Sequence, residues 1–164
     1  MSFGRGIALA ILVLALDQAT KWGLLGWMLA RPPGERLVPV TSFFNVVLVW
    51  NRGVSFGMFN GGDGGLNAVA FSALAAVIVI GLLVWLWRAT QGLVIAGIGL
   101  VIGGAIGNVI DRLRFGAVVD FLDFHAAGWH WPAFNVADAA ICIGVGLIVI
   151  DGLLGRREMP NKVA

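Results

Sequence analysis

The sequence predicts an all-α integral membrane protein with four transmembrane helices and a small β-rich extracytoplasmic region between helices 1 and 2. Hydrophobic residues make up 59% of the 164 residues and charged residues only 12%, whereas soluble proteins average roughly 45–50% and about 25%. Four segments are long and apolar enough to cross the hydrocarbon core of a bilayer, which takes roughly 20 residues of helix. These two observations exclude an ordinary soluble domain.

We expect the helices at about residues 6–30, 66–87, 92–110 and 133–154 of a single membrane-embedded domain, residues 1–164. In the first segment, Asp17 and Lys21 stand where a signal-peptide cleavage site would fall, and apolar sequence then resumes. We therefore expect this segment to remain as a helix. The third segment has a glycine every four residues, a stripe that lets another helix approach closely: Gly99, Gly103 and Gly107.

Basic residues indicate the orientation of the helices. Four spans place both termini on one side, and basic residues are denser there than in the other connections: Arg5, Arg88, Arg156, Arg157 and Lys162. Because cytoplasmic segments carry an excess of Lys and Arg, we expect both termini to be cytoplasmic. The basic residues form no run, so the pI near 9.3 does not indicate a nucleic-acid partner.

The two outer segments, residues 31–65 and 111–132, differ in character. "LVPVTSFFNVVLVW" in the first is rich in β-branched and aromatic residues and predicts short strands, with Pro39 at an edge or break. "NGGDGG" after it predicts a flexible turn. For residues 121–134 we expect a loop.

Acidic residues gather near one end of the expected helices. Charges within membrane spans are rare and usually face a bundle interior or a wet cleft. Apart from Asp17, the acids of interest lie at or beyond the outer ends of the spans: Asp111, Asp120, Asp123 and Asp138. This placement predicts a site at the outer membrane surface.

Several of these residues also have a purely structural interpretation. Asn135 and Asp138 have the spacing of a capping box at a helix start. Asp17 and Lys21 have the spacing of an ion pair between successive helical turns.

Two of the remaining acids also have a structural interpretation, and one does not. Asp111 beside Arg112 fits an anchor at the end of a span, and Asp123 fits a solvated loop position without a role. Asp120 is harder to explain, because "AVVDFLDF" places it among apolar neighbours.

Asp120 and Asp138 together suit acid–base hydrolysis. Apolar surroundings raise the pKa of Asp120, whereas the positive N-terminal end of the fourth helix favours the ionised form of Asp138. Two carboxylates of unequal proton affinity can share one water: the ionised one removes its proton and the protonated one polarises a peptide carbonyl. The segment 121–134 is long enough to bring them together.

Other catalytic arrangements are weaker. "GVSFG" at 53–57 matches the G-x-S-x-G pattern around Ser55, but that pattern needs a strand–turn–helix context and an aligned histidine. His125 and His130 lie in the other outer segment and are expected at the membrane interface. With no H-E-x-x-H motif and a single cysteine, Cys142, in an apolar run, we expect no metal and no cofactor.

Four motifs resemble those of the bacterial lipoprotein signal peptidases, the signal peptidase II family: "LDQATK", "NRGVSFG", "GGAIGNVIDRLRFGAVVDF" and "FNVADAAI". Each is modest alone, but their order and intervals are specific, and the resemblance extends over nearly the whole chain. It implies an intramembrane aspartyl endopeptidase of the bacterial inner membrane, with its active site toward the extracytoplasmic side. Such an enzyme removes signal peptides from prolipoproteins by cleaving before a diacylglyceryl-modified Cys, so its partners are prolipoproteins and membrane lipids.

The same resemblance implies that Asp120 and Asp138 are the catalytic pair. Other motif positions imply residues that shape the site or bind substrate: Asp17, Lys21, Asn51, Asn108, Asp111, Arg112 and Asn135. We expect Arg112 to pair with Asp111, Asn51 and Asn135 to donate hydrogen bonds to a carboxylate or to substrate, and the Gly-rich stretch 53–65 to act as a lid. Arg52 departs from the small or polar residue expected before Gly53.

Two alternatives come from other functional classes. Asp17 and Lys21 are compatible with a small proton- or ion-coupled transporter, although transporters usually hold such groups near the midplane of repeated halves, and no repeat is visible. A structural membrane protein predicts that neutralising Asp120 has little effect. Cleavage of a lipid-modified peptide by the purified protein separates both from the enzyme.

Overall fold

Four long helices form the body of the protein. The computed structural model describes residues 2–53 and 64–155. Its helices are α1 (Ser2–Leu29), α2 (Gly64–Arg88), α3 (Gly92–Phe115) and α4 (Val136–Gly155). All four contain a stretch that is apolar and long enough to cross a membrane. The mostly helical membrane fold expected from composition is confirmed.

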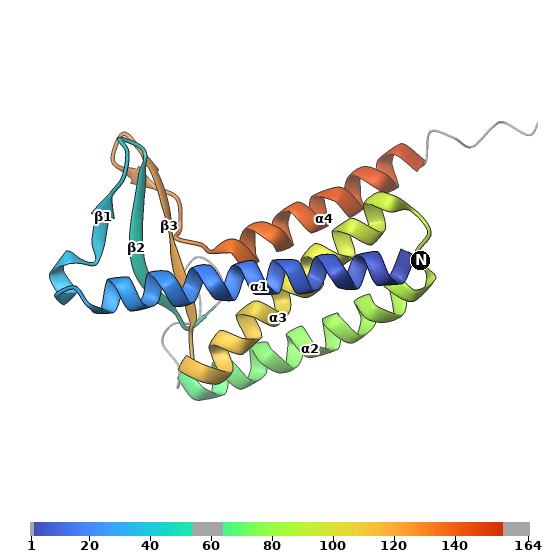
Figure 1. Ribbon diagram of the computed structural model, residues 1–164, viewed down its shortest axis with the longest axis horizontal. Coiled ribbons are helices and arrows are strands. Elements are labelled where there is room, and N and C mark those ends of the chain that lie inside the picture. Colours follow the sequence, from blue (N-terminus) through green and yellow to red (C-terminus); the bar gives the residue numbers. More distant parts are fainter. Residues whose placement is uncertain (1, 54–63, 156–164) are drawn as a thin grey trace, which may run out of the picture.

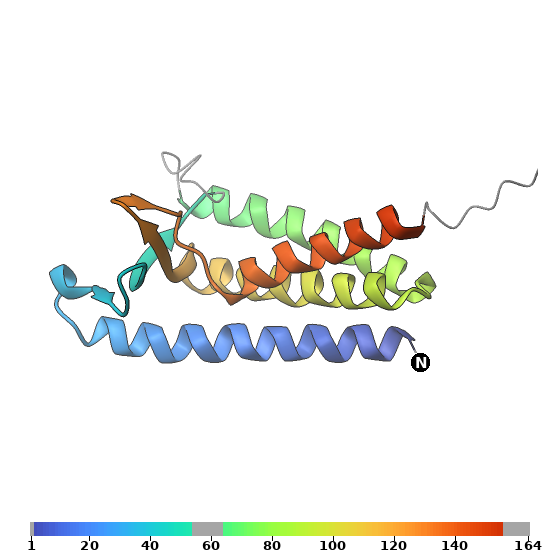
Figure 2. The same ribbon diagram turned by 90° about the horizontal axis from the view of Figure 1, so that it is seen from above.

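α3 is the central helix of the bundle. In Figure 2 it lies between α1 on one side and α2 and α4 on the other. Apolar side chains of α1, α2 and α3 form a buried core that includes Ala10, Leu86, Val94, Ile95, Ile98 and Ile102. Outside this core, the helices around α3 leave many apolar side chains exposed, such as Ile78 of α2 and Val149 of α4. Large exposed apolar surfaces of this kind mark contact with a membrane or a partner.

Glycines let α1 approach the backbone of α3. A Cβ atom on Gly103 would lie 2.5 Å from the carbonyl oxygen of Ala10, and one on Gly99 would lie 2.6 Å from that of Gly6. Both distances are too short for a real Cβ, so larger residues would force the helices apart. The glycine stripe predicted for close helix packing is confirmed.

A second set of glycines faces α4. A Cβ atom on Gly97 would lie 2.6 Å from the carbonyl oxygen of Gly144, and one on Gly104 would collide with that of Ala137. α3 is thus packed at backbone distance on two sides. This close packing fixes where the start of α4 lies relative to α1 and α3.

A four-stranded antiparallel sheet lies at the end of the bundle opposite the start of α1 and the end of α4 (Figure 1). Its strands, in order across the sheet, are β1 (Leu37–Pro39), β2 (Phe44–Asn51), β3 (Val118–Ala126) and β4 (Trp129–His130). A short 3₁₀ helix, η1 (Pro33–Glu35), precedes β1. The strands expected after the first helix are confirmed, and Pro39 ends an edge strand as expected.

The sheet also contains strands that the sequence did not predict. β3 and β4 come from the connection between α3 and α4, where we expected a loop at 121–134 and no part of the β region. Acidic residues are depleted in strands, and Asp120 and Asp123 therefore concealed β3. Both carboxylates accept hydrogen bonds from side-chain amides, which makes their burial in the sheet tolerable.

Several helix ends differ from the expected ones, α1 for example beginning at Ser2 rather than 6, and two of the differences bear on the site. α3 continues past residue 110 to Phe115, so Asp111 and Arg112 lie in its last turns. It stops at Gly116, whose φ of 69° is left-handed and whose N–H donates to the carbonyl of Arg112 at 2.9 Å. α4 begins at Val136 rather than 133. Ser55, most of the expected lid at 53–65, and Arg156, Arg157 and Lys162 lie outside the described residues.

The glycine contacts predict which helix positions tolerate a larger side chain. Replacing Gly103 with Leu should lower the free energy of unfolding by about 1–3 kcal/mol, because the side chain must push α1 away from α3. Thermal unfolding in detergent measures the effect. Gly81→Leu is the matched control, since nothing lies within 4 Å of a Cβ atom at Gly81 in α2. Equal melting temperatures for the two variants would contradict the close packing of α1 on α3.

Candidate active site at the sheet end of the bundle

α4 begins with reciprocal hydrogen bonds between Asn135 and Asp138. Asn135 immediately precedes the helix, and its Oδ1 accepts the backbone N–H of Asp138 at 3.0 Å. In return, Oδ2 of Asp138 accepts the backbone N–H of Asn135 at 3.3 Å. This is a capping box, which satisfies donors that a helix start leaves free. The structural interpretation of this pair is confirmed, and the cap fixes both side chains in place.

Asp17 binds the same helix start from α1. Its Oδ1 accepts the backbone N–H of Ala137 at 3.0 Å. A Cβ atom on Gly107 would collide with the Asp17 carboxylate, so glycine leaves the space that this carboxylate occupies. Asp17 has no exposed surface. It therefore ties α1, α3 and α4 together at one point.

The ammonium group of Lys21 joins the carboxylates of two helices. Nζ lies 2.9 Å from Oδ2 of Asp17 and 2.8 Å from Oδ2 of Asp111, and it donates to Oδ1 of Asn108 at 3.1 Å. These partners match the three donors of an ammonium group. Lys21 is only 2% exposed, so its charge is compensated entirely within the protein. The expected ion pair of Asp17 and Lys21 is confirmed.

The expected pairing of Asp111 with Arg112 is wrong. Asp111 binds Lys21 and also accepts the backbone N–H of Val119 at 3.1 Å. Arg112 lies instead with its guanidinium carbon 5.5 Å from the centre of the Phe71 ring. Successive residues of a helix project in different directions, so the side chains of Asp111 and Arg112 do not face each other. The charge of Arg112 nevertheless attracts the carboxylates around it.

Gln18 belongs to this network although sequence reasoning did not single it out. Its Nε2 lies within hydrogen-bond distance of Oδ2 of Asp17 at 3.1 Å, and of the carbonyl oxygen of Gly107 and Oδ1 of Asp111 at 3.3 Å each. The available signal was its position: Gln18 is a polar residue inside an apolar span, next to Asp17. Such residues usually face a bundle interior.

β3 carries Asp120 to the same region. Asp120 pairs with Val49 of β2, and Val118 pairs with Asn51. Asp120 and Asn51 therefore project from one face of the sheet as diagonal neighbours. Nδ2 of Asn51 donates to Oδ2 of Asp120 at 3.0 Å, and Nδ2 of Asn135 donates to Oδ1 at 2.7 Å. Both amides expected to donate to a carboxylate do so.

The surroundings of Asp120 oppose its ionisation. The side chain is only 1% exposed. Burial, and after it the negative charge of Asp138, raise the pKa of Asp120 from 3.8 to about 7, against the lowering effect of the hydrogen bonds from Asn51 and Asn135. Near neutral pH, Asp120 is therefore able both to hold and to release a proton.

The start of α4 is fastened to β3 by the backbone. The N–H groups of Phe121 and Leu122 donate to the carbonyl of Phe134 at 3.1 and 2.9 Å, and the N–H of Phe134 donates to Leu122 at 3.1 Å. The next residue, Asn135, is thereby held beside Asp120. This explains why α4 begins later than expected.

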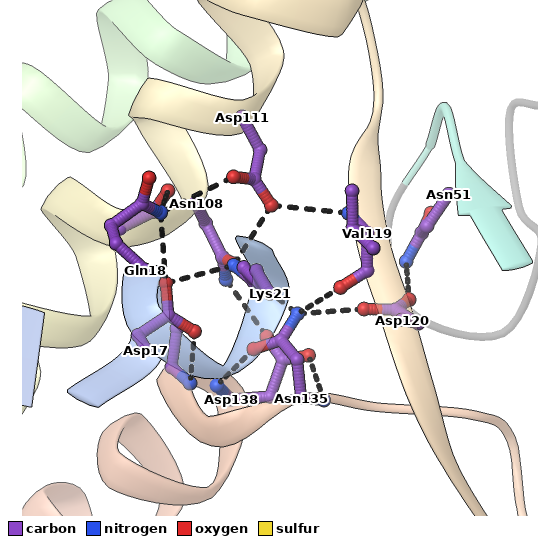
Figure 3. Close-up of polar contacts among 12 residues, drawn as sticks. Asp17, Gln18, Lys21, Asn51, Asn108, Asp111, Val119, Asp120, Asn135 and Asp138 are labelled. Carbon is purple, nitrogen blue, oxygen red and sulfur yellow. Dashed lines mark hydrogen bonds and ion pairs between the residues drawn. The ribbon is translucent and has the colours of Figure 1, made fainter. Parts of the chain in front are cut away.

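Asn135 stands between the two candidate catalytic carboxylates (Figure 3). Its side chain binds Asp120 and its backbone binds Asp138. Asn108 adds a second link, because its Nδ2 donates to Oδ1 of Asp138 at 2.8 Å while its Oδ1 accepts from Lys21. An apolar pocket of about 370 Å³ adjoins Asp138, and its lining includes Phe134, Ala139 and Cys142. The arrangement gives two carboxylates, held by amides, beside an apolar space.

Comparison with known proteins decides the family. Residues 9–154 match the family described as signal peptidase (SPase) II. The chain belongs to the signal peptidase II family. The resemblance seen in the sequence motifs is confirmed, and the transporter and structural alternatives are no longer needed.

Relatives in the signal peptidase II family are similar over almost their whole length. The lipoprotein signal peptidase of Rhodopseudomonas palustris (strain TIE-1) is 50% identical over 155 residues, which cover 92% of each chain. That of Methylorubrum extorquens (strain PA1) is 46% identical over 161 residues, 98% of this chain and 92% of the relative. A solved bacterial membrane enzyme is 30% identical with a TM-score of 0.81, covering 98% of this chain and 95% of the other.

The prediction that Asp123 of this signal peptidase II chain is a solvated loop residue is wrong. Asp123 was expected to be solvated, yet it is only 5% exposed. It accepts a hydrogen bond from Nδ2 of Asn45 at 2.8 Å and lies 2.8 Å from Nδ1 of His130. These hydrogen bonds lower the pKa of Asp123, although burial opposes the shift. Asp123 was misplaced because the strand that buries it was not foreseen.

The sequence-predicted site residues of this family member come together from five elements, α1, β2, α3, β3 and α4, and from the cap of α4. Asp17, Lys21, Asn51, Asn108, Asp111, Asp120, Asn135 and Asp138 form one hydrogen-bonded and ion-paired network. Arg112 stands at its edge on the Phe71 ring. Within residues 2–53 and 64–155, no group of three or more His, Cys, Asp or Glu side chains is arranged to hold a metal ion.

The Lys21 network predicts a large stability effect. Lys21→Met leaves Asp17 and Asp111 buried without their cation, which should cost about 3–5 kcal/mol of unfolding free energy. Thermal unfolding and protease resistance in detergent report the loss. Thr20→Ala is the neighbouring control, because the Thr20 hydroxyl binds only carbonyl groups of its own helix, at 2.8 and 2.9 Å. A Lys21→Met protein as stable as Thr20→Ala would rule out this role of Lys21.

Proposed function

We propose that this signal peptidase II family member is an intramembrane aspartyl endopeptidase that cleaves prolipoproteins before a diacylglyceryl-modified Cys. One observation carries the aspartyl mechanism: Asp120 from β3 and Asp138 from α4 share Asn135 as a common hydrogen-bond donor. In acid–base hydrolysis, two neighbouring carboxyl groups with different pKa values act as the general acid and the general base. The lipoprotein substrate class rests on the relatives, which are named lipoprotein signal peptidases.

In the proposed reaction, the Asp138 carboxylate removes a proton from water as the water oxygen attacks the scissile carbonyl carbon. Protonated Asp120 donates its proton to the carbonyl oxygen. When the tetrahedral intermediate collapses, the C–N bond breaks, the proton on Asp138 passes to the leaving nitrogen, and Asp120 recovers a proton from the intermediate. The products are a signal peptide with a new terminal carboxylic acid and the free amine of the lipid-modified Cys, and the acid then loses its proton to the amine or to water.

The two roles follow from the surroundings of each carboxylate. Asp138 lies in the first turn of α4, where the helix dipole and hydrogen bonds from Asn108 and the Asn135 backbone favour negative charge, against the effect of its burial. Asp120 is enclosed in the sheet, and its raised pKa allows it to be protonated near neutral pH. Because the carboxylates interact, they titrate as a coupled pair.

The same proposal includes an orientation. Arg5 and Arg88 lie at the end of the bundle away from the sheet (Figure 1), and an excess of basic residues marks the cytoplasmic side. Both termini are then cytoplasmic, and the sheet and catalytic pair face the extracytoplasmic side of the inner membrane. There the lipid-modified Cys of a substrate remains anchored in the bilayer while its backbone reaches the two carboxylates.

Removing either carboxylate tests the mechanism directly. Asp120→Asn and Asp138→Asn should each lower kcat for a lipid-modified peptide by at least about a hundredfold, since each removes a proton-transfer group. Asp151→Asn, at the far end of α4, is the matched control and should cleave normally. Melting temperatures show whether the variants remain folded. Substantial turnover by a folded Asp120→Asn or Asp138→Asn protein would remove that residue from the mechanism.

The pH dependence tests the role of Asp120 as the acid. Because the reaction needs protonated Asp120 and its pKa is about 7, kcat/KM should fall as pH rises through this region. Asn51→Ala removes a hydrogen bond that lowers this pKa, so the fall should move to higher pH. Asn45→Ala, in the same strand but bound to Asp123, should leave the position of the fall unchanged. An Asn51→Ala profile shifted to lower pH would contradict the assignment.

A further inference from the structure

A second hollow lies on the sheet, away from the catalytic network. It encloses about 430 Å³, and aromatic side chains of the β3–β4 hairpin and its surroundings form most of its wall. We call it the aromatic hollow; its lining includes Phe43, His125, Trp129, Trp131 and Phe134. Trp129 is 62% exposed and Phe43 is 56% exposed. Aromatic surface left open to this extent marks a place where another molecule binds.

The aromatic hollow adjoins the pocket beside Asp138. Trp131 and Phe134 line both spaces. Phe134 is also fixed to β3 by backbone hydrogen bonds, so the wall between the two spaces is held in place. The two spaces therefore lie next to each other, on either side of residues that they share.

His125 supplies a polar group in this aromatic wall. Its Nε2 is buried and has no hydrogen-bond partner among the described residues, which costs free energy. The ring stacks on His130 with centroids 4.9 Å apart. His130 is in turn bound to Asp123, and Asp123 to Asn45 of β2. The wall is thus built from a connected set of side chains.

The position of the hollow indicates which part of a substrate it receives. If the proposed function holds, the signal peptide lies along the membrane helices and the rest of the prolipoprotein leaves from the sheet end. The hollow lies in the sheet that covers this end (Figure 1). The chain that follows the scissile bond therefore leaves at the end of the bundle where the hollow lies.

We propose that the aromatic hollow binds the residues that follow the lipid-modified Cys, as an extended peptide. An apolar or aromatic side chain of this segment packs against Trp129, Trp131 and the ring of His125. The inference rests on the proposed function and adds a specificity determinant to it. The enzyme then reads the mature side of its substrate as well as the signal peptide.

Two synthetic peptides test this inference. Both carry the same signal sequence and the same diacylglyceryl-Cys; one ends as an amide at that Cys, and the other continues for several residues, one of them aromatic. The wild-type protein should cleave the extended peptide with about tenfold higher kcat/KM, mainly through KM, as burial of one aromatic side chain allows. Trp129→Ala and His125→Ala should lose this advantage and still cleave the short peptide at the wild-type rate.

Trp87→Ala is the control, because Trp87 is an exposed tryptophan of α2 outside the hollow. It should keep the advantage of the extended peptide. Equal cleavage of both peptides by the wild type, or an advantage that survives in Trp129→Ala, would overturn the inference. So would an equal loss for both peptides in Trp129→Ala, which would identify the hollow as a contact with lipid. If the wild type cleaves neither peptide, the proposed function itself fails.

Discussion

The structure depends on one buried cation. Lys21 lies inside the bundle and is shared by Asp17 of α1 and by Asp111 and Asn108 of α3. A charged group in a membrane interior is tolerated only with partners, and here each partner has a second task. Asp17 binds the start of α4, Asp111 binds the backbone next to Asp120, and Asn108 binds Asp138. A single ammonium group therefore sets the position of both candidate catalytic carboxylates without touching either.

The glycines of α3 make this arrangement possible. Contact at backbone distance with α1 and with α4 brings side chains from all three helices within reach of one another. The sheet then closes the remaining side, because β3 passes over the end of the bundle and carries Asp120 to the cap of α4. Helix packing positions one carboxylate and strand pairing positions the other. Neither element alone would form the pair.

Much of this could be read from the sequence, because the signals are local. Apolar length predicts the helices, the rarity of charges in spans singles out Asp17 and Lys21, and the spacing of Asn135 and Asp138 predicts the cap. The unlike surroundings of Asp120 and Asp138 suggested the pair, and the family motifs supplied the reaction and its substrate.

What could not be read depends on contacts between distant segments. Asp111 binds Lys21 rather than its neighbour Arg112 because helix geometry turns the two side chains apart. Asp123 is buried because β3 pairs with β2, and the two Asp residues obscured the strand preference of the Val and Phe residues in β3. Gln18 acquires its partners only when α1 meets α3.

The cap at Asn135 has a consequence for how the chain can vary. Serine, aspartate and asparagine are close to interchangeable as helix caps, so stability alone would leave this position free to drift. Asn135, however, must accept a hydrogen bond from the α4 backbone and donate one to Asp120 with the same side chain. Aspartate would bring a third negative charge to the pair, and serine is too short to span both partners. An otherwise permissive position is thereby reduced to one amino acid.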